Sequence, residues 1–292
     1  MDVSVIIVNY NTKELTKNCI DSIFEKTSGV TFEVILVDNA STDGSVEVFV
    51  QDNRIFFIQN NRNLGFGLAN NEGNKIAQGK YVFFLNPDTL LLNNAIKILY
   101  DFMECHSHAG ICGGNLFDSE LNPIHSYRMM LPSFAWEMDY HLGQMFTRIR
   151  WGKNAEYNDS EAPMKVGYIT GADMMIRKEI FDKVGGFSKY FFMYYEECEL
   201  TYRINELGFN SYSVPSAKIQ HLEGKSFPST DFTTKDRFLL SGKWIYRRLC
   251  FCPIIYKLLC IMTRIKLCFQ KEDERKLYLQ EVLEYIGNIQ IR

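Results

Sequence analysis

Short apolar runs alternate with polar segments of helical spacing along the first half of the chain. Four apolar runs predict buried strands, over residues 3–9, 32–37, 55–59 and 81–85. The segments that follow them predict helices, over residues 12–24, 45–50, 68–77 and 94–104. Strands that alternate with helices at this spacing are typical of an α/β sheet that is mostly parallel.

The run from Tyr81 to Leu85 is the most informative, because it ends abruptly at Asn86-Pro87-Asp88. Consecutive apolar residues are typical of a central strand that is covered on both faces. Pro87 has no N–H for a strand ladder, so the strand ends there and Asp88 lies at the carboxyl edge of the sheet. Open α/β sheets bind ligands at this edge, and a carboxylate there suits a divalent cation that also contacts phosphates. The alternative is a turn aspartate that caps the next helix.

Two other predicted strands also end in polar loops. Asn9-Tyr10-Asn11 follows the first strand and Asp38-Asn39 follows the second. Three strand ends therefore present polar side chains at one edge, as in the nucleotide sites of doubly wound sheets. Asp38 can accept a hydrogen bond from a base or a ribose, or alternatively cap the helix after Asp43-Gly44. Gly65-Phe66-Gly67 resembles part of a dinucleotide loop, but Asn70 breaks the GxGxxG pattern, which disfavours a Rossmann dehydrogenase.

The second half of the chain carries acidic residues and a histidine at the ends of predicted elements. Residues 168–176 predict a strand interrupted near Gly171, which suits close approach of the backbone to a ligand. Glu196 and Glu197 fall in the first turn of a helix predicted to end near Leu207. The helix dipole stabilises exposed carboxylates there by ~0.3–1 kcal/mol, so we expect ionised side chains that can accept a proton from a bound hydroxyl. Plain charge matching of the helix N-terminus is the alternative.

His221 ends a β-like run over residues 218–221. A neutral imidazole is a competent ligand for a divalent transition metal, and the alternative is a structural histidine. The eight cysteines show no CxxC spacing, so we expect them to be reduced.

The charge distribution divides the chain into two parts. The net charge of the whole chain is −3, but residues 235–271 hold nine Lys/Arg and one acidic residue, a net charge of +8. Residues 1–234 carry a net charge of −9. The loop-like residues 226–234 separate these parts, so we expect a domain over residues 1–230 and a helical extension over residues 231–292.

The extension has the composition of a helix that lies on a membrane surface, with basic residues between Trp, Ile and Leu. Its longest apolar run, residues 249–263, contains Pro253 and Lys257 and is shorter than the ~20 residues of a membrane span. The N-terminus shows no secretory signal, so we expect a cytoplasmic protein on the inner face of the cell membrane. The alternative is a helical hairpin whose basic face packs against the negatively charged first domain.

Six motifs occur in an order that matches a known family: residues 5–11, 37–44, 63–67, 85–88, 171–172 and 192–197. On these motifs the chain resembles the family-2 inverting glycosyltransferases of the GT-A fold, and it is most similar to their rhamnosyltransferase-like branch. The resemblance covers residues 3 to about 226. It implies an α/β fold with a Rossmann-like mixed, mostly parallel sheet flanked by helices, followed here by the C-terminal helical extension.

The resemblance also implies roles for individual residues. The nucleotide-sugar donor would be held by Asn9, Tyr10, Asn11, Asp38, Asn63, Gly65 and Asn86. The cofactor would be Mg²⁺ or Mn²⁺, with Asp88 in the place of the second carboxylate of the family's Asp-x-Asp and His221 where relatives supply a metal-binding histidine. Glu197 occupies the position of the catalytic base, with Glu196 as the other candidate. The acceptor side would include Gly171, Ala172 and Asp173.

The implied reaction is the inverting, metal-dependent transfer of a sugar to a saccharide or lipid-linked saccharide in cell-surface polysaccharide synthesis. We expect rhamnose as the sugar, with a UDP-linked hexose as the second choice. We also expect an anionic membrane surface, and no nucleic acid, as a partner. Two other classes stay open. The single carboxylate of the Asn86-Pro87-Asp88 motif mildly favours a nucleotide-sugar-binding protein without turnover. A nucleotidyltransferase would need a Gly-rich basic loop where the chain has Asn9-Tyr10-Asn11-Thr12.

Overall fold

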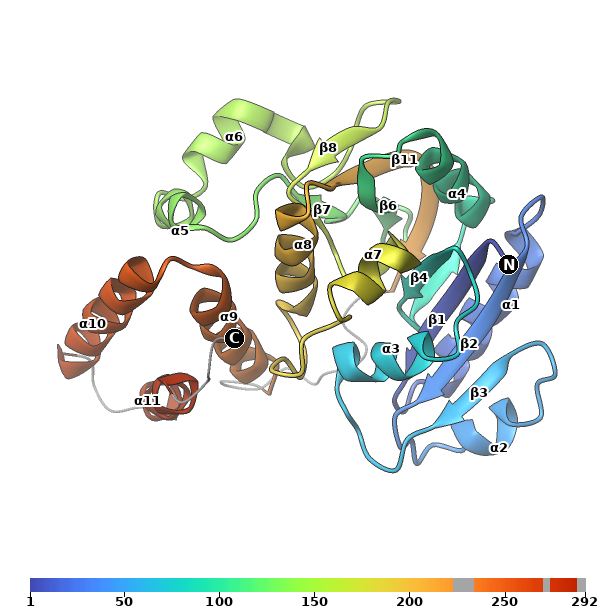
Figure 1. Ribbon diagram of the computed structural model, residues 1–292, viewed down its shortest axis with the longest axis horizontal. Coiled ribbons are helices and arrows are strands. Elements are labelled where there is room, and N and C mark those ends of the chain that lie inside the picture. The colour runs from blue at the N-terminus through green and yellow to red at the C-terminus, as the bar shows by residue number, and fades with distance from the viewer. Residues whose placement is uncertain (223–233, 270–273, 288–292) are drawn as a thin grey trace.

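A mixed sheet forms the centre of the protein, with helices on both faces (Figure 1). The computed structural model describes residues 1–222, 234–269 and 274–287, so the domain boundary expected at residues 230 and 231 lies outside the described residues. The sheet has the strand order β3-β2-β1-β4-β10-β6-β11-β5, with β8 paired to β11. Its strands are β1 (Val3–Asn9), β2 (Phe32–Asp38), β3 (Phe56–Gln59), β4 (Tyr81–Leu85), β5 (Thr89–Leu91), β6 (Ala109–Phe117), β8 (Met164–Val166), β10 (Asp173–Arg177) and β11 (Asn210–His221).

The first four strands of the chain form the parallel half of the sheet. β1 lies between β2 and β4, with Asn9 opposite Asp38 and Ile7 opposite Leu85. The carboxyl ends of β1, β2 and β4 therefore meet at one edge. Beyond β4 the sheet is mixed, because β10 runs antiparallel to both β4 and β6 while β11 runs parallel to β6. The expectation of a mixed, mostly parallel sheet is confirmed.

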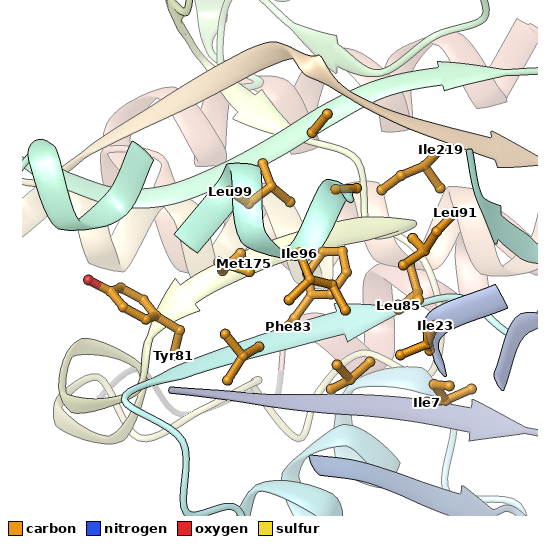
Figure 2. Close-up of a cluster of buried hydrophobic side chains, with 14 of the residues drawn as sticks. Ile7, Ile23, Tyr81, Phe83, Leu85, Leu91, Ile96, Leu99, Met175 and Ile219 are labelled. Atoms are coloured by element: carbon orange, nitrogen blue, oxygen red, sulfur yellow. The ribbon is translucent and has the colours of Figure 1, made fainter. Parts of the chain in front are cut away.

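One face of the sheet is covered by α1 (Lys13–Lys26) and α4 (Ala95–Cys105). Figure 2 shows Ile7 and Phe83 of neighbouring strands packed with Ile23 of α1 and Leu99 of α4. Burial of each such side chain contributes about 1.5–3 kcal/mol, so the apolar spacing of the two helices holds them on the sheet.

The opposite face is covered by α3 (Phe66–Asn74), α7 (Lys178–Lys183) and α8 (Glu196–Glu206). Three aromatic rings fill the space beneath these helices. The ring of Phe84 lies 4.9 Å from that of Phe181 and 5.0 Å from that of Phe187. Because Phe187 comes shortly before α8, this packing fixes the path of the chain that leads to the acidic N-terminus of that helix.

Several elements in the middle of the chain were not predicted. They are the strands β5, β6 and β8, the small sheet of β7 (Tyr127–Arg128) with β9 (Tyr168–Ile169), and the helices α5 (Phe134–His141), α6 (Met145–Trp151) and the 3₁₀ turn Gly152–Ala155. The strand expected over residues 168–176 divides into β9 and β10, which belong to different sheets. In β6, glycines hide the strand pattern because neighbouring chain leaves no room for side chains: a β-carbon at Gly114 would lie 2.5 Å from the carbonyl oxygen of Ala217.

Three helices complete the described chain: α9 (Thr234–Cys250), α10 (Pro253–Phe269) and α11 (Glu274–Gly287). They share a buried cluster with the first domain, in which Phe191 and Cys198 pack with Trp244, Ile245 and Tyr246 of α9. Helix α9 therefore packs on the preceding part of the chain through apolar side chains, whereas the alternative left by the sequence was a hairpin that packs through its basic face. No helix in the described ranges combines the length and the apolar character needed to cross a membrane.

Helices α5, α6, α10 and α11 lie together at one end of the molecule, and β3 with α2 (Ser45–Phe49) lies at the other (Figure 1). Of the C-terminal helices, α9 reaches the loop that borders the carboxyl edge of the parallel strands, because Phe238 stacks on Phe192, whose carbonyl accepts a hydrogen bond from the backbone N–H of Phe66.

Candidate active site

Asn9 and Asp38 meet at the carboxyl ends of β1 and β2. Nδ2 of Asn9 donates a hydrogen bond to Oδ2 of Asp38 at 2.7 Å, and the backbone N–H of Ser41 donates to Oδ1 of Asp38 at 2.9 Å. Asp38 is fully buried, so its carboxylate joins the two strand ends to the following turn rather than capping α2, which begins later at Ser45. Tyr10 and Asn11 are exposed at the same strand end and are the side chains there that a ligand would meet first.

A loop that follows β3 is held to this edge by Asn39. Nδ2 of Asn39 donates to Oδ1 of Asn63 at 2.8 Å, and Oδ1 of Asn39 accepts from the backbone N–H of Leu64 at 3.0 Å. Oδ1 of Asn63 also accepts from the backbone N–H of Gly65 at 2.9 Å. The sequence placed Asn63 and Gly65 near the donor but gave no role to Asn39. The signal available was its position directly after Asp38 in a polar strand end.

Asp88 and His221 face each other at this edge. Oδ1 of Asp88 lies 3.3 Å from Nε2 of His221, and both side chains are 11% exposed. Nδ2 of Asn86 lies 3.4 Å from the same ring nitrogen. The pairing of β5 with the end of β11 produces this meeting, because Thr89 is opposite His221 in the antiparallel register. The helix-capping alternative for Asp88 is wrong, since a strand follows it.

The side chains of Asp88, His221 and Asn86 together suit a divalent cation whose remaining ligands come from a substrate. They offer a carboxylate oxygen and an imidazole nitrogen at one point, with the side-chain amide of Asn86 beside them. In the ranges that the structure describes, no cluster of three or more His, Cys, Asp or Glu side chains could hold an ion with protein ligands alone. Mg²⁺ is commonly bound by one or two carboxylates together with substrate phosphates and water. The donor set therefore fits a cation that is completed by a diphosphate.

Ala172 and Asp173, which the sequence placed on the acceptor side with Gly171, lie beside Asn86. The backbone N–H of Asn86 donates to the carbonyl of Ala172 at 2.9 Å, and Asp173 is opposite Leu85 in the sheet. The side chain of Asp173 is enclosed: it is fully buried, and its Oδ2 accepts from the backbone N–H of Gly114 at 2.6 Å. Burial raises the pKa of Asp173 well above its usual value, which favours a neutral carboxyl.

Glu196 and Glu197 occupy the first turn of α8, as the sequence predicts. Glu196 is only 4% exposed, and its Oε2 is buried with no hydrogen-bond partner among the described residues. Burial, and next the neighbouring Glu197, raise the pKa of Glu196 well above its usual value. Glu197 is partly exposed, and burial raises its pKa as well. Burial thus opposes the stabilisation by the helix dipole that the sequence led us to expect, and it does so most strongly at Glu196.

The backbone that leads into this turn is held in an unusual conformation. Tyr194 and Tyr195 have φ angles of 68° and 72°, a region that costs non-glycine residues of the order of 1–3 kcal/mol each. Gly242 of α9 packs directly on them, since a β-carbon there would lie 2.5 Å from the carbonyl oxygen of Tyr194. The ring of Tyr195 also contacts that of Tyr246, at 6.0 Å between centroids. Helix α9 therefore stabilises the strained turn that positions the two glutamates.

Phe192 connects this turn to the donor side of the site. Its carbonyl accepts a hydrogen bond from the backbone N–H of Phe66 at 2.9 Å, and its ring stacks on Phe238 of α9 at 4.7 Å. The sequence includes Phe192 in the motif over residues 192–197 but does not predict its contact with Phe238, because a contact between an aromatic loop residue and a helix far along the chain has no local pattern. The polar residues at the strand ends and the Glu196–Glu197 pair are thus linked through Phe192.

Residues 4–185 match the family model described as glycosyl transferase family 2. This match covers more than half of the chain, and the chain therefore belongs to glycosyl transferase family 2. The protein is a glycosyltransferase with a C-terminal helical extension.

Two curated relatives are similar over comparable lengths. N-acetylglucosaminyl-diphospho-decaprenol L-rhamnosyltransferase of Mycobacterium tuberculosis is 30% identical over 210 residues, which are 66% of this chain and 67% of that protein. Low-salt glycan biosynthesis hexosyltransferase Agl10 of Haloferax volcanii is 28% identical over 214 residues, 72% of this chain and 63% of that protein. The matches thus span about two-thirds of the length of these relatives. The expected likeness to a rhamnosyltransferase is confirmed.

Among solved structures, the crystal structure of GalNAc-T7 with UDP, GalNAc and Mn²⁺ has a TM-score of 0.65 and 16% sequence identity. The alignment covers 99% of this chain and 56% of that chain. This likeness concerns the fold and confirms the expected GT-A architecture.

Proposed function

We propose that the protein transfers a sugar from a nucleotide diphosphate donor to a lipid-linked saccharide, with inversion at the anomeric carbon. The meeting of Asp88 with His221 at 3.3 Å, on the edge where β1, β2 and β4 end, carries this proposal. Two metal-binding side chains beside the ligand-binding edge of a glycosyltransferase sheet suit a donor whose leaving group is a diphosphate.

In this proposal the nucleoside lies along the strand ends, against the residues that the sequence assigned to the donor: Asn9, Tyr10, Asn11, Asp38, Asn63, Gly65 and Asn86. The buried hydrogen bond between Asn9 and Asp38 keeps the two strand ends rigid, so Tyr10 and Asn11 are presented in a fixed orientation. Asp88 and His221 would hold Mg²⁺ or Mn²⁺, and the cation would supply charge neutralisation for the departing diphosphate.

Glu197 is the proposed general base. It is the more accessible of the two glutamates. Its raised pKa makes its carboxylate a stronger base, which is better able to accept the proton of the acceptor hydroxyl. Glu196 is the less suitable candidate, because burial and its neighbour favour its neutral form. The acceptor hydroxyl attacks as Glu197 accepts its proton, and the bond from the anomeric carbon to the diphosphate breaks on the opposite face. A single displacement of this kind inverts the configuration.

The sugar and acceptor classes follow the relatives. One relative is named as a rhamnosyltransferase acting on a diphospho-decaprenol saccharide, and the other as a hexosyltransferase of glycan biosynthesis. We therefore propose rhamnose as the first sugar to test and a UDP-linked hexose as the second, in the synthesis of a cell-surface polysaccharide.

A surface of α10 supports action at a membrane. Its exposed apolar side chains repeat every three or four residues and so lie on one face: Ile254, Leu258, Ile261, Ile265 and Phe269. Lys257 and Arg264 are exposed on the same helix. Apolar faces bordered by basic side chains suit the surface of an anionic bilayer, where each basic residue contributes about 1 kcal/mol.

Helices α5 and α6 extend this surface with the exposed side chains Phe134, Met138, Phe146 and Ile149, at the same end of the molecule as α10 (Figure 1). We propose that this end rests on the inner face of the cell membrane.

The test is an assay of the purified protein with a panel of UDP-, GDP- and dTDP-sugars, with Mn²⁺ or with a chelator. Release of a nucleoside diphosphate that depends on the cation, together with an inverted anomeric centre by NMR, is the expected result. Pyrophosphate release would instead indicate a nucleotidyltransferase, and donor binding without release would indicate a binding protein.

A further inference from the structure

A cavity of about 810 Å³ lies between α9, α10 and α11, away from the strand ends. Its size is in the range of sites that enclose small organic ligands. Five cationic side chains line it, Lys243, Arg247, Lys266, Arg275 and Lys276, and Glu137 of α5 is the one acidic side chain among the described residues of the lining. The excess of positive charge favours an anionic ligand.

The single carboxylate is already engaged. Glu137 forms a two-point ion pair with Arg247 and lies 3.4 Å from the ammonium of Lys243. Burial lowers the pKa of Lys243, because a cation loses solvation in this position. An anion bound beside Lys243 would restore part of that lost stabilisation.

Apart from Thr263, the rest of the lining is apolar. Leu259, Met262 and Leu267 of α10 face Trp244 of α9 and Leu279 of α11. The cavity therefore combines a basic region with an apolar wall. Helix α10, whose exposed face was proposed above to contact the membrane, supplies much of the apolar wall and Lys266 of the basic region. A ligand with a charged head and a hydrocarbon chain matches this combination.

We propose that this cavity binds the diphosphate and the adjoining prenyl units of the lipid-linked acceptor. The inference rests on the proposed function in that the acceptor is taken to be lipid-linked. A prenyl-linked diphosphate carries charge on both of its phosphates, which matches five cationic side chains better than the single charge of a phosphodiester lipid. The branched prenyl chain matches the apolar wall.

Helix α9 connects the cavity to the catalytic turn. Trp244 and Arg247 line the cavity, whereas Phe238 stacks on Phe192 and Gly242 packs against Tyr194. One helix thus borders both the lipid site and the loop that positions Glu197. The two sets of contacts are on opposite faces of α9, so a lipid held here would be separated from the catalytic turn by the width of this helix.

Calorimetric titration of the full chain with farnesyl diphosphate tests the proposal. The double variant Lys266→Gln/Arg275→Gln removes two exposed cations of the lining, and Lys257→Gln/Arg264→Gln removes two exposed cations of α10 outside it. We expect wild type and control to bind alike, and the cavity variant to bind at least tenfold more weakly. Equal affinities for the two variants would overturn the proposal.

Further titrations separate the possible sources of the binding. Farnesol and inorganic pyrophosphate should each bind at least tenfold more weakly than farnesyl diphosphate, since each lacks one half of the ligand. Phosphatidylglycerol vesicles that compete with farnesyl diphosphate at equal lipid concentration would show that the cavity takes phospholipid and would overturn the assignment. Hydrolysis of the donor in the absence of acceptor reports on the proposed function separately. A protein that hydrolyses the donor but does not bind farnesyl diphosphate would reject only the lipid site. A protein that binds farnesyl diphosphate but shows no turnover would reject only the transferase proposal.

Discussion

Gly65 and Phe192 are in backbone contact that leaves no space for a side chain. A β-carbon on Gly65 would lie 2.2 Å from the carbonyl oxygen of Phe192, and Gly65 has a φ of 82° that L-residues rarely adopt. The same carbonyl accepts a hydrogen bond from the N–H of Phe66 at 2.9 Å. The loop proposed to border the donor and the loop proposed to carry the base are therefore positioned by each other.

Gly65→Ala should separate these two loops. We expect its free energy of unfolding to fall by about 2 kcal/mol more than that of Gly185→Ala, because overpacking adds to the backbone strain. Gly185 is the matched control: its φ is also 82°, but nothing lies within 4 Å of a β-carbon there. Urea denaturation measures the difference, and equal losses in the two variants would show that the Phe192 contact is unimportant for stability.

Asp88→Asn should abolish cation-dependent transfer while the protein remains folded. Loss of the carboxylate removes several kcal/mol of stabilisation from the leaving diphosphate, which corresponds to at least a hundredfold loss of kcat. The measurement is nucleoside diphosphate release at saturating Mn²⁺. Activity near that of wild type would exclude Asp88 from the mechanism.

His221→Ala should raise the Mn²⁺ concentration needed for half-maximal activity. The exposed His108 provides the control, and His108→Ala should leave the Mn²⁺ dependence unchanged. If the two variants show the same Mn²⁺ titration curve, His221 is a structural residue.

Glu197→Gln should lower transfer by ~10²–10⁴-fold and leave donor binding intact, since it removes basicity and keeps the shape of the side chain. Donor affinity from calorimetry and transfer rates from product formation separate the two effects. A larger loss of kcat in Glu196→Gln than in Glu197→Gln would reverse the assignment of the base.

Glu196→Gln should also change the pH dependence of stability. Burial raises the pKa of Glu196 in the folded protein, so the native state holds a proton that the unfolded state releases above its ordinary pKa of 4.5. Wild-type stability therefore falls as pH rises from about 4.5 through the raised pKa. The variant should gain stability relative to wild type at pH 8 but not at pH 4.

The exposed Glu206, at the other end of α8, is the control for this comparison. Glu206→Gln should track wild type at both pH values in chemical denaturation. If Glu196→Gln also tracked wild type at both pH values, burial of the Glu196 carboxyl would not lower the free energy of unfolding.

Flotation with liposomes tests the membrane surface. Wild type should float with anionic but not neutral vesicles, and high salt should reduce the recovery. Ile261→Ser/Ile265→Ser on α10 should reduce flotation, and Val48→Ser/Val50→Ser, in exposed positions at the other end of the molecule, should not. Equal recovery in the soluble fraction under all conditions would leave packing on the first domain as the role of the extension.

The parallel half of the fold could be predicted from the sequence because its signals are local. Each of the three strands that end at Asn9, at Asp38 and just before Asp88 is a single hydrophobic run. Parallel pairing brings the ends of these strands to one edge. The position of the glutamate pair could also be predicted, since Glu196 and Glu197 begin a helix with a clear period.

The remaining features depend on contacts between distant segments. His221 meets Asp88 only because the short strand β5 pairs with β11, and β5 has too few residues to show a period. The raised pKa of Glu196 depends on burial of the turn, which the helix dipole argument did not include. The strand β6 was hidden by its glycines, of which Gly114 is required by the close approach of β11 and Gly113 by that of β9 and β10.

The stacking of Phe192 on Phe238 has a consequence for exchanging parts between related enzymes. The helices of the extension follow both the family match, which ends at residue 185, and the last strand of the sheet, β11, so they are a natural unit to exchange in a chimera. Its first helix nevertheless supports the strained Tyr194–Tyr195 turn through Gly242. A graft that keeps an aromatic residue at position 238 and a glycine at position 242 preserves the support of the catalytic turn, and the residues beyond α9 can then be varied to suit another membrane or another lipid.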